Sequence, residues 1–157
     1  MDAGRPLLIT YVDTSALARL IFGEGDLTMV RRALQEGPIS SELTVVETRA
    51  ALWKRWHDND VDESERDELL SVADSLLFSA ISMLSLNSKV MAEASTIVAR
   101  FPVRTLDALH LATAATAFRQ ARRHGRVLRF CTADRRQSRA AEELFGSDHV
   151  LLVPPPC

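Results

Sequence analysis

The chain has 157 residues, of which 46% are hydrophobic and 25% are charged, and its formal net charge is −2 at pH 7. These proportions are typical of a globular protein and exclude a disordered chain, and the length suits one domain, 1–157, with a core over about 7–154. The N-terminal apolar run ends at Asp13, too early to cross a bilayer, and does not resemble a signal peptide. We therefore expect no membrane association.

Charge is unevenly distributed along the chain. The segment 100–139 contains ten arginines and only two acids, whereas 58–68 is strongly acidic. A local basic field is sufficient for binding nucleic acid, but arginine stems can equally cover apolar surface on solvated helices. The two cysteines, Cys131 and Cys157, predict free thiols in a reducing cytoplasm and not a disulfide.

The apolar pattern predicts strands and helices that alternate along the chain. The expected strands are 8–12, 39–41, 81–86, 127–132 and 150–153. The expected helices are 14–22, 26–36, 42–58, 62–79, 88–100, 105–124 and 135–145, with Thr14 or Ser15 as the cap of the first and Thr105 as the cap of the sixth. This order favours parallel strands joined by right-handed crossovers. We predict an α/β three-layer sandwich with a five-stranded parallel sheet and helices on both faces.

Four acidic residues occupy positions where burial is expected. Asp13 and Asp134 follow apolar strands, and Glu47 and Asp107 lie in helices with apolar neighbouring turns. Buried carboxylates are normally paired or bound to a metal, and the carboxyl ends of parallel strands share one edge of the sheet. We therefore expect one crevice that holds Mg²⁺ or Mn²⁺, ions that prefer oxygen ligands. Alternatively, the two post-strand acids are turn or capping residues, and Asp107 complements the dipole of its helix.

Other polar and aromatic residues have two interpretations. The hydroxyls of Ser15 and Thr132 either bond the carboxylates or a metal-bound water, or make local turn bonds. His110 is expected to pack or hydrogen-bond, not to bind metal. Trp53 and Trp56 make their helix apolar on more than one side, which indicates deep burial or an interface. We also expect repulsion among the four acids to raise the pKa of at least one of them.

Four segments, in order, resemble the motifs of the PIN-domain family and, within it, the VapC-type toxins of toxin–antitoxin pairs. They are VDTSAL (12–17), TVVETRAAL (44–52), LDALHLATA (106–114) and TADRR (132–136). The order and spacing of these motifs match the family over nearly the whole chain, from Tyr11 to Pro154. One such motif alone would be weak, but four in order are specific.

The resemblance implies a PIN-like fold and a Mg²⁺- or Mn²⁺-dependent endoribonuclease that hydrolyses phosphodiester bonds in RNA. It implies that Asp13, Glu47, Asp107 and Asp134 form the catalytic, metal-binding quartet. It also implies a homodimer that is neutralised by a VapB-type antitoxin. The alternative is a catalytically idle PIN-like module that binds RNA or protein without cleavage.

Three other classes with an Asp after the first strand fit the sequence less well. A haloacid-dehalogenase-like phosphatase needs a second acid two residues later, where this chain has Ser15. A von Willebrand-type adhesion site needs a second serine where this chain has Leu17. A receiver domain needs an acidic pair by the first strand and a late lysine, and both are missing from the sequence.

Overall fold

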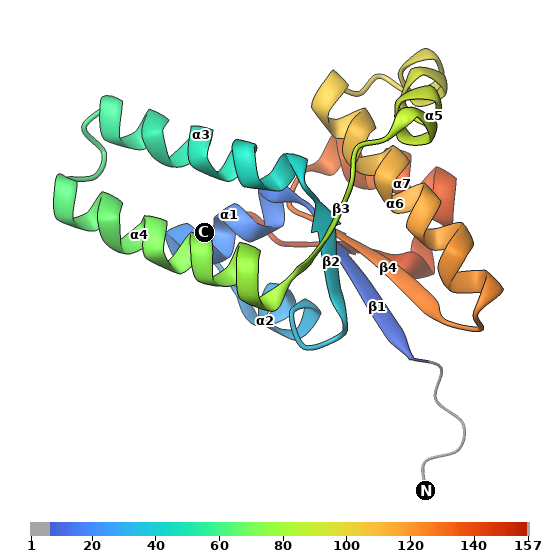
Figure 1. Ribbon diagram of the computed structural model, residues 1–157, viewed down its shortest axis with the longest axis horizontal. Helices are drawn as coiled ribbons and strands as arrows, with labels where there is room; N and C mark the ends of the chain where they lie inside the picture. Colours follow the sequence, from blue (N-terminus) through green and yellow to red (C-terminus); the bar gives the residue numbers. More distant parts are fainter. Residues whose placement is uncertain (1–6, 157) are drawn as a thin grey trace, which may run out of the picture.

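A computed structural model describes residues 7–156, and Figure 1 shows a central sheet with helices packed on its two faces. The strand order is β3-β2-β1-β4-β5, and all four neighbouring pairs are parallel. The strands are β1 (Leu8–Val12), β2 (Pro38–Ser41), β3 (Ser82–Leu84), β4 (Val127–Thr132) and β5 (Val150–Leu152). The predicted α/β three-layer sandwich with a five-stranded parallel sheet is confirmed.

Helices cover both faces of this sheet. They are α1 (Thr14–Phe22), α2 (Thr28–Ala33), α3 (Leu43–His57), α4 (Glu63–Ser75), α5 (Ser88–Arg100), α6 (Thr105–Arg123) and α7 (Arg135–Phe145). Helices α5, α6 and α7 pack on one face, and α1, α2 and the turn after α4 pack on the other. Helices α3 and α4 contact each other and project beyond the sheet as an antiparallel pair (Figure 1).

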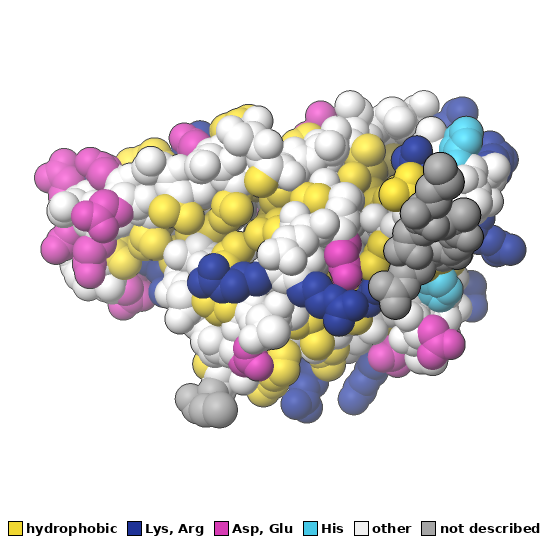
Figure 2. Space-filling view, turned by 90° about the horizontal axis from the view of Figure 1, so that it is seen from below, with side chains coloured by type: hydrophobic (Ala, Val, Ile, Leu, Met, Phe, Trp, Pro, Cys, Tyr) yellow, Lys and Arg dark blue, Asp and Glu magenta, His cyan; other side chains and the backbone are white. Residues whose placement is uncertain are grey.

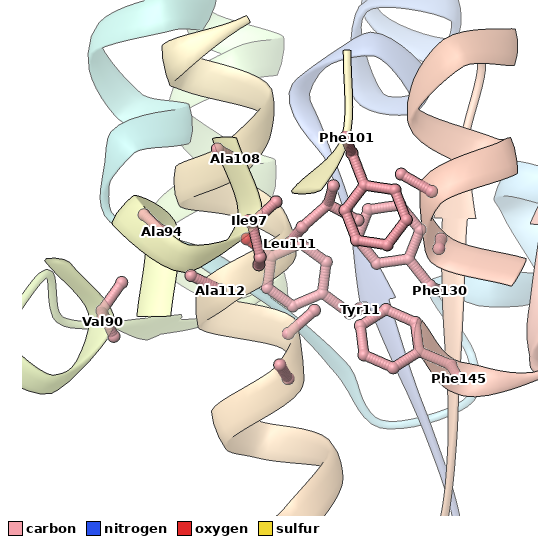
Figure 3. Close-up of a cluster of buried hydrophobic side chains, with 14 of the residues drawn as sticks. Tyr11, Val90, Ala94, Ile97, Phe101, Ala108, Leu111, Ala112, Phe130 and Phe145 are labelled. Carbon is pink, nitrogen blue, oxygen red and sulfur yellow. The ribbon is translucent and has the colours of Figure 1, made fainter. Parts of the chain in front are cut away.

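Neighbouring residues of the two central strands supply the two halves of the core. Tyr11 and Phe130 are paired across β1 and β4, and their rings stack 5.3 Å apart beneath α5–α7 (Figure 3). Val12 and Cys131, the next pair, belong to the core on the opposite face. This alternation follows from the two-residue period of a strand, and burial on both faces explains why β1 and β4 read as continuous apolar runs.

Several predicted boundaries and caps are wrong. Asp13, not Thr14 or Ser15, caps α1, because its carboxylate accepts a hydrogen bond from the backbone of Ala16. The N-cap position of α6 is Arg104, and Thr105 is the first helical residue. The predicted helix 26–36 is shorter in the structure, Thr28–Ala33, and the predicted helix 62–79 becomes a wider π-helical turn (Leu76–Ala80) after Ser75. The predicted strands 81–86 and 150–153 are also shorter, Ser82–Leu84 and Val150–Leu152.

Two findings bear on the surroundings of the protein. In the range 7–156, no helix combines the length and apolarity needed to cross a membrane. Cys131 is a buried free cysteine, and burial, with a smaller contribution from the charge of Asp13, raises the pKa of its thiol to about 12. Cys157 lies outside the described residues.

Gly37, which precedes β2, provides a test of the backbone geometry. Its φ is +56°, and a Cβ there would lie 3.1 Å from the carbonyl oxygen of Leu8. Gly125 has a similar φ of +62° but open space around the same position. We expect Gly125→Ala to lower the free energy of unfolding by about 1 kcal/mol through backbone strain alone, and Gly37→Ala by about twice that. Equal losses in urea unfolding would show that β1 does not restrict this turn.

Candidate active site at the carboxyl edge of the sheet

The four predicted acids line one hollow of about 240 Å³. Asp13 follows β1 and Asp134 lies just beyond β4, the neighbouring strand, so both lie where the strand order reverses. Glu47 reaches the hollow from α3 and Asp107 from the first turn of α6. The remaining lining residues are Thr14, Ser15, Ala18, Ala51, Arg104, His110 and Gln137.

Asp13 is the most buried of these acids, with 1% of its surface exposed. Its Oδ1 accepts hydrogen bonds from the backbone N of Ala16 (2.9 Å) and from Oγ of Ser15 (2.8 Å), and its Oδ2 accepts one from Oγ1 of Thr132 (2.6 Å). The predicted contacts of Ser15 and Thr132 with a carboxylate are therefore present. Burial raises the pKa of Asp13, although the charge of His110 and these hydrogen bonds act in the opposite direction. The expected rise in pKa is present, but its cause is desolvation and not repulsion among the acids.

Glu47 is held by a hydrogen-bonded network that ends in the core. Its Oε1 accepts from Nε2 of His110 (2.5 Å) and from Oγ1 of Thr14 (2.7 Å). Nδ1 of the same ring forms a hydrogen bond with the hydroxyl of Tyr11 (2.8 Å). Burial raises the pKa of Tyr11 well above its usual value, and so do the charges of Asp13 and Glu47, so this hydroxyl keeps its proton. His110 is hydrogen-bonded in the interior, as expected.

The same network favours the ionised form of Glu47. Burial by itself would raise the pKa of this carboxyl. The hydrogen bond and charge of His110, the hydrogen bond from Thr14 and the charge of Arg104 together outweigh burial and hold the pKa of Glu47 below its usual value. At neutral pH the Glu47 side chain is therefore a carboxylate that faces the hollow.

A row of hydroxyls connects the Glu47 helix to the central strand. Oγ1 of Thr14 lies 3.3 Å from Oγ1 of Thr44, which lies 2.8 Å from Oγ of Ser40. Ser40 in turn donates to the backbone carbonyl of Val12 (2.6 Å). These bonds fix the start of α3 against the end of β1, and so they fix the position of Glu47 relative to Asp13.

Asp107 and Asp134 share one cation, Arg104. Its Nε donates to Oδ2 of Asp107 (2.9 Å), and one terminal nitrogen lies 3.4 Å from Oδ1 of Asp107 and 3.3 Å from Oδ2 of Asp134. The Oδ1 of Asp134 caps α7 by accepting from two backbone N–H groups. The alternative predicted from sequence is therefore also observed: Asp13 and Asp134 are helix caps that also line the hollow.

Three polar residues that line the hollow were not predicted from the sequence to belong to the site. Thr14 lies inside the same motif as Asp13 and gives no separate signal. Arg104 precedes Asp107 by three residues, a spacing at which helical side chains meet, and this was the available clue. Gln137 is buried, its Oε1 lies 3.2 Å from Oγ1 of Thr132, and its side-chain amide donates to the backbone carbonyl of Asp107. Its role depends on two distant segments and has no local sequence signature.

The donor set of the hollow fits a hard divalent cation in kind. Four carboxylates and several hydroxyls face it, and its histidine is already bonded to Tyr11 and Glu47. As the side chains stand, no three acidic, histidine or cysteine groups among residues 7–156 surround a single ion position. The oxygens of Asp107 and Asp134 instead contact Arg104, which provides the opposite charge at this point.

The raised pKa of Asp13 predicts a pH dependence of stability. The unfolded chain loses this proton near the ordinary pKa of 3.8, and the folded protein loses it at a higher pH. Between the two pKa values the free energy of unfolding therefore falls as pH rises, and the destabilisation is complete above both. In EDTA we expect Asp13→Asn to melt above wild type at neutral pH, with the difference shrinking as pH falls toward 4. The exposed Asp148→Asn is the control; a pH-independent difference for Asp13→Asn would contradict the assignment.

Comparisons with known proteins agree with this architecture. The family model for the PIN domain matches residues 10–143. A chain of a toxin–antitoxin complex from Klebsiella pneumoniae has 17% identity and a TM-score of 0.55, with 90% of this chain and 95% of that chain covered. PAE2754 from Pyrobaculum aerophilum has 20% identity and a TM-score of 0.55, with 92% and 93% covered. At these identities the likeness concerns the fold, and no curated protein sequence matches. Because the family model spans most of its length, the chain belongs to the PIN-domain family.

Proposed function

We propose that this protein is a Mg²⁺- or Mn²⁺-dependent endoribonuclease and the toxin of a VapBC-type toxin–antitoxin pair. The observation that carries the proposal is the hollow into which four separate elements bring Asp13, Glu47, Asp107 and Asp134. Burying several carboxylates together costs desolvation free energy, which suggests that they are present for function and not for stability. PIN domains are generally nucleases. A cytoplasmic location remains a prediction from the two cysteines.

The chain's own residues divide the work of phosphodiester hydrolysis. Asp13, Asp107 and Asp134, together with Glu47, would hold the ion. When bound, such an ion lowers the pKa of water and neutralises charge on the scissile phosphate. Glu47 has an oxygen free to accept a proton from water, because its two hydrogen bonds go to Oε1 and the described residues donate none to Oε2. The oxygens of Asp134 are already engaged by the α7 cap and Arg104.

Substitution of the acids tests catalysis. We expect Asp13→Asn or Asp107→Asn to lower metal-dependent cleavage of structured RNA at least ~10²-fold, because placement of the ion supplies several kcal/mol of rate enhancement. The measurement is product formation from labelled RNA in Mg²⁺, Mn²⁺ or EDTA, with circular dichroism to verify folding. Wild-type rates in a folded Asp13→Asn protein, purified in the same way, would refute the site.

The same assay separates the nuclease from the idle binding module. A nuclease loses RNA cleavage both in EDTA and in the Asn variants. A binding module instead retains RNA in a filter assay and releases no product in any metal. Binding without cleavage by wild type would therefore favour the module and overturn the enzymatic proposal.

The outer side of α3 is the best candidate for the partner surface. Val46 is 65% exposed, Trp53 is 39% exposed, and Ala50 between them is also exposed, which makes one helical stripe. Trp53 is thus not deeply buried, and the guanidinium of Arg66 lies over its ring and that of Trp56, 5.2 and 5.0 Å from their centroids. Figure 2 shows acidic side chains gathered at the far end of the α3–α4 pair. We propose that an apolar, basic segment of the antitoxin, or a second copy of the chain, covers this stripe.

A double charge substitution tests that surface. Val46→Glu with Trp53→Glu should weaken the complex at least ~10-fold, because charges would replace apolar side chains at the centre of the contact. Met91→Glu on α5, with 52% exposure, is the matched control. Sedimentation of the protein alone reports the homodimer, and pull-down with a candidate VapB-type antitoxin reports the heteromer. An active double variant that behaves like wild type in both would exclude the stripe.

A further inference from the structure

The guanidinium of Arg104 lies at the acid-lined hollow, where the chain itself supplies a cation. Among the residues that line the hollow, all within 7–156, it is the one arginine or lysine side chain. It bridges two elements, because its guanidinium bonds Asp107 at the start of α6 and Asp134 at the start of α7. These hydrogen bonds, with the charge of Asp107, raise the pKa of Arg104, so it is always charged.

The guanidinium uses the same oxygens that a metal ion would need. Both carboxylate oxygens of Asp107 lie within 3.4 Å of its nitrogens, and it also contacts Oδ2 of Asp134. The other oxygen of Asp134 is engaged by the backbone of α7. An ion that binds Asp107 and Asp134 together competes with Arg104 for these oxygens, and repulsion between the two neighbouring cations favours displacement of the guanidinium.

Arg104 is free to leave, whereas the acids are fixed. The Arg104 side chain is 71% exposed, compared with 12% for Asp107 and 25% for Asp134. The described residues offer Arg104 no other ion-pair partner than these two acids. An exposed ion pair of this kind is weak, so its exchange costs little. Once displaced, the planar guanidinium remains at the mouth of the hollow, where it suits bidentate contact with a phosphate.

We propose that Arg104 is a latch on the metal site. It offsets part of the negative charge of Asp107 and Asp134 while no ion is bound, is exchanged for the divalent cation, and then contacts the RNA backbone beside the acids. The latch rests on the proposed function, because it presupposes that the acids bind a divalent ion. It predicts that removal of Arg104 strengthens metal binding while it destabilises the metal-free protein. An arginine that only supported the site would show the opposite metal effect.

The test is the affinity of the RNA-free protein for Mn²⁺, measured by calorimetric titration or from the electron paramagnetic resonance signal of free Mn²⁺. We expect Arg104→Gln to bind Mn²⁺ about fivefold more tightly than wild type, because the ion no longer competes with an exposed ion pair. Arg122→Gln, at the exposed far end of the same helix, removes the same charge and should change the affinity less than twofold. In EDTA, Arg104→Gln should melt about 2–4 °C lower and gain more from Mn²⁺ than wild type gains.

A second variant protects the test against misfolding. Arg104→Lys keeps the charge but not the fork that spans two carboxylates, so its Mn²⁺ affinity should fall between those of wild type and Arg104→Gln. If wild type binds Mn²⁺, Asp13→Asn abolishes that binding, and neither Arg104 variant binds more tightly, the latch is wrong and the metal site stands. If wild type shows no saturable Mn²⁺ binding and no metal-dependent cleavage, the proposed function fails and the latch fails with it.

Discussion

A carboxylate that follows the buried end of a central strand has to be solvated by the protein itself, and Asp13 is in this position. Its two oxygens accept hydrogen bonds from Ser15, Ala16 and Thr132. Each donor carries a structural consequence. The Ala16 bond starts α1, the Thr132 bond fixes the end of β4 beside β1, and Ser15 also accepts from the backbone of Ala133. The requirement to satisfy one buried acid thus organises the edge of the sheet on which the whole site is built.

Around Asp13, the site consists of three hydrogen-bonded groups with different electrostatics. Burial raises the pKa of Asp13, and the His110 and Thr14 contacts overcome burial to lower the pKa of Glu47. The third group is the pair of Asp107 and Asp134 with Arg104. One hollow therefore contains a carboxyl group with a raised pKa, one with a lowered pKa, and an ion pair. Pairs of titratable groups whose surroundings shift their pKa values in opposite directions are common at functional sites.

The sequence was sufficient for the parts of the structure that depend on local pattern. Strands β1 and β4 are continuous apolar runs, and the acids that follow them necessarily lie at one edge of a parallel sheet. The cap of α1 was misassigned because a hydroxyl and a carboxylate both cap helices, and the choice between them depends on the turn that the chain adopts. Gln137 and the Ser40–Thr44–Thr14 row were not predictable, because each bonds to residues far away in the sequence. Arg104 could have been recognised from its spacing, but its contact with Asp134 required the tertiary structure.

The strand order determines how late in synthesis and folding the hollow can form. Strand β1, at the start of the chain, has β2 on one side, but its other neighbour, β4, is separated from it by more than a hundred residues. Asp13 therefore lacks the Thr132 bond, and the hollow lacks Asp134, until most of the chain has been synthesised. Pairings with such long loops also form late in folding, because loop closure must precede them. A chain that stops before β4 would carry three of the acids without the hollow, so this site can assemble only after the segment through Asp134 has been added.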